Sequence, residues 1–134
     1  MKEYISWNDF DILVDELADM IPEGVYEGVY AVPRGGLITG VMLSHKLELP
    51  FIDRLQGYYG KKFLIVDDIA DTGETLNRFK AEIYDHADIA TIHYHKQSIV
   101  EPAYWVESKG DRWIVYPWEK KSSEEIQDYL KETK

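Results

Sequence analysis

The stretch Phe63-Leu-Ile-Val-Asp-Asp-Ile-Ala-Asp-Thr-Gly-Glu-Thr75 indicates which fold this chain adopts. Its apolar start, Phe63 to Val66, predicts a buried parallel strand that ends at two adjacent carboxylates. A short turn follows, and a helical pattern then runs from Glu74 to Tyr84. Ligands of open α/β sheets bind at the carboxyl ends of strands. The stretch therefore predicts both an α/β architecture and the place of a binding site.

The two carboxylates are those of Asp67 and Asp68. Carboxylates accept hydrogen bonds from vicinal hydroxyls of a sugar, and they also bind a magnesium ion with its waters. Two consecutive acids repel each other at the end of a buried strand, so they need a compensating partner. We therefore expect a sugar diol or a divalent cation at this position.

The turn that follows, Asp71-Thr-Gly-Glu-Thr75, begins a helix. The free N–H groups and positive dipole end of a helix start suit a phosphate. The hydroxyls of Thr72 and Thr75 add donors, and Gly73 permits close approach of a backbone. Together with the acid pair, the turn predicts a ribose 5-phosphate that carries a pyrophosphate. Helix capping by Asp71 or Thr72 is the competing interpretation, and it leaves the acid pair unexplained.

This combination of strand, acid pair and acid-Thr-Gly-x-Thr turn resembles the phosphoribosyl pyrophosphate (PRPP) signature of type I phosphoribosyltransferases. The resemblance implies catalytic roles for Asp67, Asp68 and Asp71, with Mg²⁺ as cofactor at Asp67 and Asp68. It also implies that Asp71 lies near an incoming base and accepts or relays its proton. The PRPP-binding residues implied in this stretch are Asp67, Asp68, Asp71, Thr72, Gly73, Glu74 and Thr75.

A second turn, Ala31-Val-Pro-Arg-Gly-Gly-Leu37, lies between a predicted strand over Gly28–Val32 and a predicted helix over Leu37–Leu47. Its position indicates the same ligand-binding edge of the sheet. The resemblance implies that Arg34 and Gly35 contact the pyrophosphate, with a cis peptide bond between these two residues. Taken alone, the motif is also typical of a glycine-rich turn with an exposed arginine.

The segments Thr91–Lys96 and Asp111–Glu119 resemble the 6-oxopurine branch of the family, especially bacterial and archaeal xanthine–guanine and hypoxanthine phosphoribosyltransferases. The resemblance implies that Lys96 donates to the purine O6, that Trp113 stacks on the ring, and that backbone groups at Ile114 read the base edge. The competing interpretations are a solvated strand end for Lys96 and ordinary core for Trp113. His93 and His95 share one face of a strand, and we expect both to be structural.

Alternation of strands and helices predicts an α/β fold, a mostly parallel sheet flanked by helices. We expect a single phosphoribosyltransferase domain over 1–134, with a small C-terminal hood formed mainly by residues 97–121. The segment over Glu101–Gly110 is predicted to be irregular. The other predicted elements are helices over Ser6–Ile21, with Ser6 and Asp9 as a capping box, and Ser122–Leu130, and strands over Pro50–Ile52, Ile89–Tyr94 and Trp113–Tyr116.

Composition excludes several classes of partner. The chain has 134 residues, with 15 Lys and Arg against 25 Asp and Glu, for a net charge of −10. Because a nucleic-acid footprint is basic, we expect no nucleic-acid partner. No apolar run approaches the roughly 20 residues that span a bilayer, so no membrane partner is expected. The chain has no cysteine, which fits a cytoplasmic protein.

The sequence therefore predicts a purine salvage enzyme that takes PRPP and a purine base as partners, with Mg²⁺, and that forms a dimeric or tetrameric homo-oligomer. The choice among xanthine, guanine and hypoxanthine stays open. A non-catalytic PRPP or nucleotide sensor and a response-regulator-like domain are the alternatives. The segment over Asp53–Lys62, with Tyr58-Tyr59, is short for a catalytic lid, so we expect at most a partial one.

Overall fold

The computed structural model describes residues 2–58, 60–82 and 86–120 and contains a five-stranded parallel sheet. Its strands follow the order β3-β2-β4-β5-β6. The order therefore reverses between β2 and β4, which is where ligands bind in open α/β sheets. The strands are β2 (Val29–Ala31), β3 (Phe51–Ile52), β4 (Leu64–Ala70), β5 (Asp88–Tyr94) and β6 (Tyr104–Ser108).

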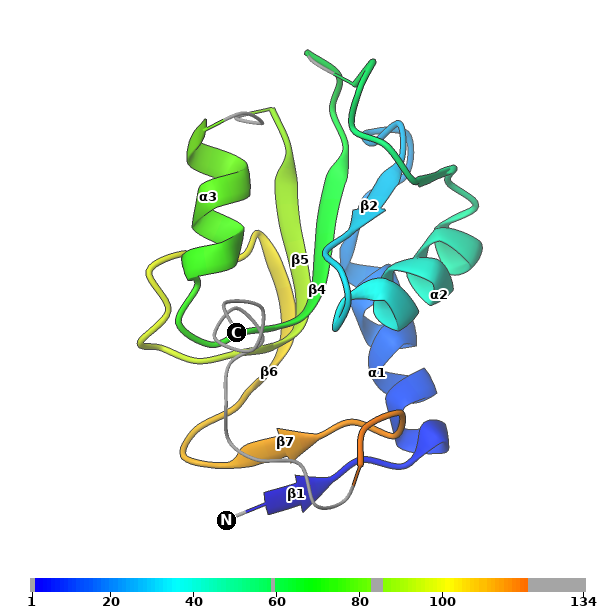
Figure 1. Ribbon diagram of the computed structural model, residues 1–134. Helices are drawn as coiled ribbons and strands as arrows, with labels where there is room; N and C mark the ends of the chain where they lie inside the picture. Colours follow the sequence, from blue (N-terminus) through cyan, green and yellow to red (C-terminus); the bar gives the residue numbers. More distant parts are fainter. Residues whose placement is uncertain (1, 59, 83–85, 121–134) are drawn as a thin grey trace.

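Helices cover both faces of this sheet, which confirms the predicted α/β class (Figure 1). Helices α1 (Trp7–Met20) and α2 (Leu37–Leu47) pack on one face, and α3 (Glu74–Glu82) packs on the other. Helix α1 begins where predicted, because Ser6 Oγ accepts a hydrogen bond from the Asp9 N–H at 3.1 Å. None of the described helices has the length and apolar content needed to cross a membrane.

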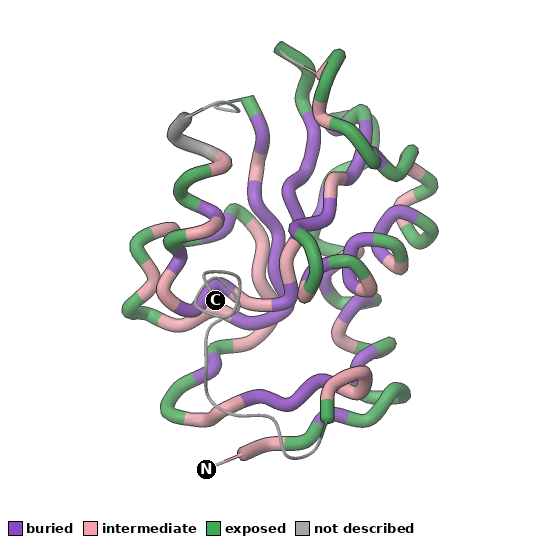
Figure 2. Tube along the Cα trace, in the orientation of Figure 1, coloured by how far each residue is buried: buried purple, intermediate pink, exposed green. Residues whose placement is uncertain are grey.

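The core lies on the two faces of the central strands, which are buried along most of their length (Figure 2). Leu64 and Val66 of β4 pack with Phe10, Val14 and other residues on the α1 and α2 side. Ile65, between them, packs with the α3 side. This alternation is the two-residue period of a strand buried on both faces.

Strand β4 is longer than predicted, so the expectation that it ends at Val66 was wrong. The strand continues to Ala70 because β5 continues beside it, with Ile69 paired to His93 and Ala70 paired to Tyr94. Strand β2 leaves earlier, and the Val32 N–H donates to the Val66 carbonyl oxygen at 2.8 Å. Asp67 and Asp68 therefore lie inside β4, where β2 has already turned away.

The predicted irregular segment over Glu101–Gly110 is also wrong, because β6 forms there and pairs in parallel with β5. A second sheet joins β7 (Trp113–Val115) to β1 (Lys2–Tyr4), with Glu3 in register with Ile114. Strand β1 was not predicted, since three residues beside a chain end show no periodicity of their own. The predicted helix over Ser122–Leu130 lies outside the described residues.

The segment between β3 and β4 runs away from the carboxyl edge of the sheet. In Figure 1 it rises to the end of the molecule opposite β1 and β7. The Tyr58 ring packs against Phe63, just before β4 begins, with centroids 6.0 Å apart. Tyr58 thus lies at the amino end of β4, whereas the acid pair lies toward its carboxyl end.

Candidate functional site

The acid pair occupies adjacent positions of β4 with different surroundings. Asp68 is buried, whereas Asp67 is half-buried, and Asp67 Oδ1 accepts a hydrogen bond from the Asp68 N–H at 2.8 Å. Successive side chains of a strand leave toward opposite faces of the sheet. The pair therefore provides carboxylate oxygens on both sides of the strand, which suits a ligand that wraps around its end.

Asp71 is a buried carboxylate, with 5% of its surface exposed. Gln97 Nε2 donates to its Oδ1 at 3.1 Å, and Lys109 Nζ donates to its Oδ2 at 2.9 Å. Both partners come from segments that lie more than twenty residues away in sequence. These contacts orient the carboxylate from two sides, which plain helix capping does not require.

The β4 turn (residues 71–75) leads into α3 at Glu74. Thr72 Oγ1 accepts from the Glu74 N–H at 3.4 Å, and the Thr72 carbonyl accepts from the Ile99 N–H at 2.9 Å. Gly73 has φ of 80°, and a Cβ there would lie 2.3 Å from Ser98 Oγ. The glycine is thus required by the chain segment packed over the turn, in addition to its left-handed backbone. Glu74 is exposed and Thr75 is half-buried.

The β2 turn (residues 32–36) lies beside the acid pair. It is closed by the Gly36 N–H, which donates to the Val32 carbonyl at 2.9 Å, and a Cβ on Gly36 would lie 2.6 Å from the Val66 carbonyl oxygen. Arg34 is exposed and Gly35 is half-buried. The cis peptide bond joins Pro33 to Arg34, so the expected bond between Arg34 and Gly35 was wrong.

The predicted base-binding residues lie in different environments. Lys96 follows β5 and is exposed. Trp113 is half-buried in β7, and its Nε1 is buried without a hydrogen-bond acceptor among the described residues. The Lys109 ammonium lies over the Trp113 ring, 5.1 Å from its centroid. The Ile114 side chain belongs to the core, which leaves only its backbone available to a ligand.

A chain of polar groups, buried at its centre, joins Tyr116, which follows β7, to β4, β5 and β6. His93 Nδ1 lies 2.8 Å from Tyr116 Oη, and His93 Nε2 lies 3.0 Å from Glu107 Oε1. The Tyr116 hydroxyl also donates to the Asp68 carbonyl oxygen at 3.2 Å. Burial lowers the pKa of His93, and burial together with nearby carboxylates, chiefly Asp68, raises the pKa of Tyr116 well above its ordinary value. His93 is thus structural, as predicted.

The residues present fit a magnesium ion that arrives with its substrate. Over residues 2–58, 60–82 and 86–120, no three His, Cys, Asp or Glu side chains gather into a metal cluster. Magnesium usually keeps several waters and is bound through one or two carboxylates and substrate phosphates. Asp67 and Asp68 supply oxygen ligands of that kind beside the β2 turn.

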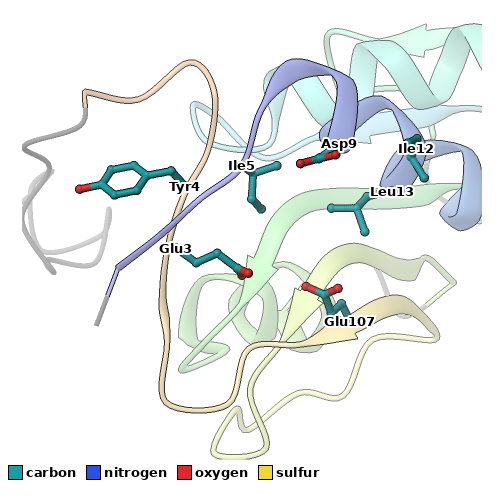
Figure 3. A pocket seen from close by; sticks show the side chains of 7 residues that line it. All are labelled: Glu3, Tyr4, Ile5, Asp9, Ile12, Leu13 and Glu107. Atoms are coloured by element: carbon teal, nitrogen blue, oxygen red, sulfur yellow. The ribbon is translucent and has the colours of Figure 1, made fainter.

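A pocket of about 250 Å³ lies elsewhere, between β1, α1 and β6 (Figure 3). Its carboxylates, from Glu3, Asp9 and Glu107, point toward it, but it contains none of the predicted site residues. Arg112 pairs with both Glu3 and Glu107. This pocket is therefore an acidic hollow between elements whose charges are partly compensated within the protein.

The sequence reasoning missed Gln97, Lys109 and Tyr116, which complete the site. Lys109 directly follows β6. Lys96 was assigned by resemblance to a family lysine at the end of a strand, and Lys109 also lies at the end of one. The prediction of an irregular segment concealed that strand, and with it the lysine.

Comparisons with known proteins agree with this geometry. The family described as the phosphoribosyl transferase domain matches residues 39–121. A xanthine-guanine phosphoribosyltransferase of Idiomarina loihiensis is 29% identical over 87% of this chain and 86% of its own length. A purine phosphoribosyltransferase structure from Pyrococcus horikoshii has a TM-score of 0.78 and 30% identity, over 94% of this chain and 99% of its own.

The fold extends to a more distant relative. A Helicobacter pylori xanthine-guanine-hypoxanthine phosphoribosyltransferase superposes with a TM-score of 0.75 at 19% identity, over 99% of this chain and 98% of its own. At that identity the likeness shows the fold alone. The parallel sheet, the flanking helices and the small additional sheet are therefore shared with solved structures of this type.

Proposed function

This chain belongs to the phosphoribosyltransferase family, and from that membership we propose that it transfers ribose 5-phosphate from PRPP to a 6-oxopurine base. The base would be xanthine, guanine or hypoxanthine, and the reaction would serve purine salvage. One observation carries this proposal. The Lys109 ammonium contacts both Asp71, from the β4 turn, and Trp113, from β7. The name of the Idiomarina relative, a xanthine-guanine phosphoribosyltransferase, supports the same class of base.

The proposed reaction forms a bond between the purine N9 and C1 of PRPP and breaks the bond between C1 and pyrophosphate. Asp67 and Asp68 would hold the ribose hydroxyls, and their negative charge suits an oxocarbenium-like transition state. The backbone of the β4 turn, with Thr72, Gly73, Glu74 and Thr75, would hold the 5-phosphate. Asp71 would accept or relay the proton of the base.

Arg34 and Gly35 would bind the departing pyrophosphate. Arg34 lies on an exposed turn beside β4, where its guanidinium presents several donors to phosphate oxygens. Bound Mg²⁺ would neutralise charge on the leaving pyrophosphate. In this proposal the protein supplies no nucleophile, and its residues bind, orient and stabilise charge.

Lys96, Trp113 and Ile114 would bind the base, with Trp113 stacking on the ring. An ammonium donates hydrogen bonds but accepts none, so it favours a 6-oxo group over a 6-amino group. We therefore propose that adenine is a poor substrate.

The test is pyrophosphate release from PRPP and Mg²⁺ with xanthine, guanine, hypoxanthine or adenine. We expect turnover with at least one 6-oxopurine and little with adenine. Equal or better turnover of adenine would overturn the proposed base class. Nucleotide binding without turnover of any base would favour the regulatory alternative, a PRPP or nucleotide sensor on this fold.

A further inference from the structure

Lys109 is a buried cation in contact with two residues of the proposed site, Asp71 and Trp113. Only 9% of the residue is exposed, and its ammonium lies between the Asp71 carboxylate, at 2.9 Å, and the Trp113 ring, 5.1 Å from the centroid. A buried charge is costly unless it is paired and hydrogen-bonded. Asp71 supplies that pairing, and the aromatic face adds an electrostatic attraction.

The backbone around Lys109 is anchored, so the direction of its side chain follows from the fold. The Lys109 N–H donates to the Tyr94 carbonyl at 2.9 Å, which attaches the end of β6 to the end of β5. The Lys109 carbonyl accepts from Arg112 Nε at 2.9 Å, and Arg112 also pairs with Glu3 of β1. The side chain thus reaches from a fixed junction of both sheets toward Asp71.

A base that turns one edge toward Asp71 would meet this ammonium, which lies against Asp71 Oδ2 and over one face of the Trp113 ring. The ammonium has three N–H donors, and Asp71 Oδ2 takes one of them. Gln97 holds the other carboxylate oxygen, so Asp71 keeps its orientation when the ammonium shares its donors with a ligand. The remaining donors suit an oxo oxygen on the base edge, an acceptor that the 6-amino group of adenine does not offer.

We propose that Lys109 is a specificity-determining residue, whose buried ammonium donates to the acceptor edge of the purine beside Asp71. The inference rests on the proposed function and deepens it, because the expected reader of the base, Lys96, is exposed after β5. Two lysines, at the ends of neighbouring strands, then serve the same base. Of the two, Lys109 is the lysine whose ammonium already contacts Asp71 and Trp113.

The test compares Lys109→Met and Lys109→Arg in the full chain, at saturating PRPP and Mg²⁺, with each 6-oxopurine and with adenine. Lys109→Met should lower kcat/KM for 6-oxopurines about 10- to 100-fold, as expected for a lost charged hydrogen bond. Because Asp71 loses a partner whichever base is bound, kcat/KM for adenine should also fall, but clearly less than for 6-oxopurines, and the KM for PRPP should stay within about twofold. Lys109→Arg should fall between Lys109→Met and the unmodified protein.

Lys46→Met is the matched control, since Lys46 also pairs with aspartate carboxylates, those of Asp11 and Asp15, but does so between α1 and α2. It should leave every kinetic constant within about twofold. Equal losses for 6-oxopurines and adenine in Lys109→Met, or no loss at all, would overturn the proposal. Thermal unfolding identifies a variant that does not fold, and Lys109→Gln, which keeps N–H donors without the charge, then carries the test.

Binding separates this inference from the proposed function. If the unmodified protein turns over no purine, guanosine and adenosine 5′-monophosphates are titrated calorimetrically into the unmodified protein and into Lys109→Met. A preference for the guanosine nucleotide that disappears in Lys109→Met would support the role of Lys109 in a protein that only binds. The inference would be overturned if Lys109→Met kept this preference unchanged. It would also be overturned if the unmodified protein showed no preference for the guanosine nucleotide.

Discussion

The β2 turn and the β4 turn both follow a strand of the same parallel sheet and both precede a helix, yet they are stabilised differently. The β2 turn is held by its own backbone and by β4, and its charged residue, Arg34, is exposed. The β4 turn is covered by residues 97–100, and the first of its two charged residues, Asp71, is buried between Gln97 and Lys109, whereas Glu74 is exposed. The protein therefore compensates the charge of Asp71 internally and leaves Arg34 open to a ligand.

This difference indicates separate tasks for the two turns. A preorganised carboxylate keeps its orientation through the reaction, which is what a catalytic group requires. An exposed guanidinium on a short turn adapts to a flexible, highly charged group such as pyrophosphate. We expect substitutions in the β4 turn to affect turnover and substitutions in the β2 turn to affect substrate affinity.

The largest effect is expected for Asp71→Asn. Proton transfer by a positioned side chain typically contributes 10²- to 10⁴-fold, so kcat should fall by about that factor. The KM for PRPP should change little, because in the proposed function the 5-phosphate is held mainly by backbone groups. Steady-state kinetics with the best purine base checks this. A kcat within a factor of three of the unmodified protein would remove the catalytic role of Asp71 and the contrast between the turns.

The acid pair should come next. Asp68→Asn and Asp67→Asn each remove a charge that is proposed to hold ribose hydroxyls and hydrated magnesium. Loss of a charged hydrogen bond costs about 1.5–3 kcal/mol, so PRPP affinity should fall roughly 10- to 100-fold. Calorimetric titration of PRPP with Mg²⁺ measures this directly. Unchanged affinity in both single variants would contradict the assignment of this pair.

Gly73→Ala tests the packing of the β4 turn. A Cβ there meets Ser98 Oγ at 2.3 Å and the Val100 backbone nitrogen at 3.0 Å, on a backbone with φ of 80°. We expect the free energy of unfolding to fall by about 2–3 kcal/mol. Gly24→Ala is the control, because Gly24 has a similar φ of 76° with nothing within 4 Å of the added Cβ.

The Gly24 variant should lose only about 1 kcal/mol, the cost of the backbone conformation alone. Urea unfolding of both variants measures the difference. Equal losses would show that the segment over residues 98–100 adjusts freely and that the β4 turn is not constrained by it.

Arg34→Ala should have a smaller effect, about a five- to tenfold rise in the KM for PRPP with kcat nearly unchanged. An exposed cation contributes about 1 kcal/mol or slightly more to an anion contact in water. Arg34→Lys should restore part of the affinity, because it keeps the charge but loses the fork of donors. A loss of kcat larger than that of Asp71→Asn would reverse the roles of the two turns.

The smallest effect concerns His93, whose hydrogen-bond partner Tyr116 donates to the backbone of the acid pair. Burial lowers the pKa of His93 in the folded protein, so below about pH 6.5 the unfolded chain takes up its proton first. The contribution of His93 to the free energy of unfolding is therefore fully present above that pH. It is lost as the pH falls toward the pKa of His93 in the folded protein.

We expect the unmodified protein to lose up to about 1 kcal/mol more than His93→Gln between pH 7.5 and pH 5.5. Urea unfolding at the two pH values checks this. An equal loss in both proteins would show that His93 titrates alike in the folded and unfolded chains.

Local sequence predicted those parts of the fold that depend on short-range physics. Helix α2 has the bounds that its pattern predicted, and α1 starts at the Ser6 cap. The β4 turn and the acid pair were recognisable because carboxylates, hydroxyls and a glycine in this order indicate a ligand chemistry without knowledge of the fold. The resemblance to the family was carried by such short motifs, and the family match over residues 39–121 confirms it.

The ends of strands and the partners of Asp71 depended on tertiary structure. Strand β4 runs past Val66 because β5 continues beside it, and β1 exists because β7 pairs with it. Gln97 and Lys109 reach Asp71 across 26 and 38 positions of sequence. Local periodicity and secondary-structure propensity do not encode such contacts. Strand pairing and the burial of a charge depend on residues that are distant in sequence and adjacent in the folded protein.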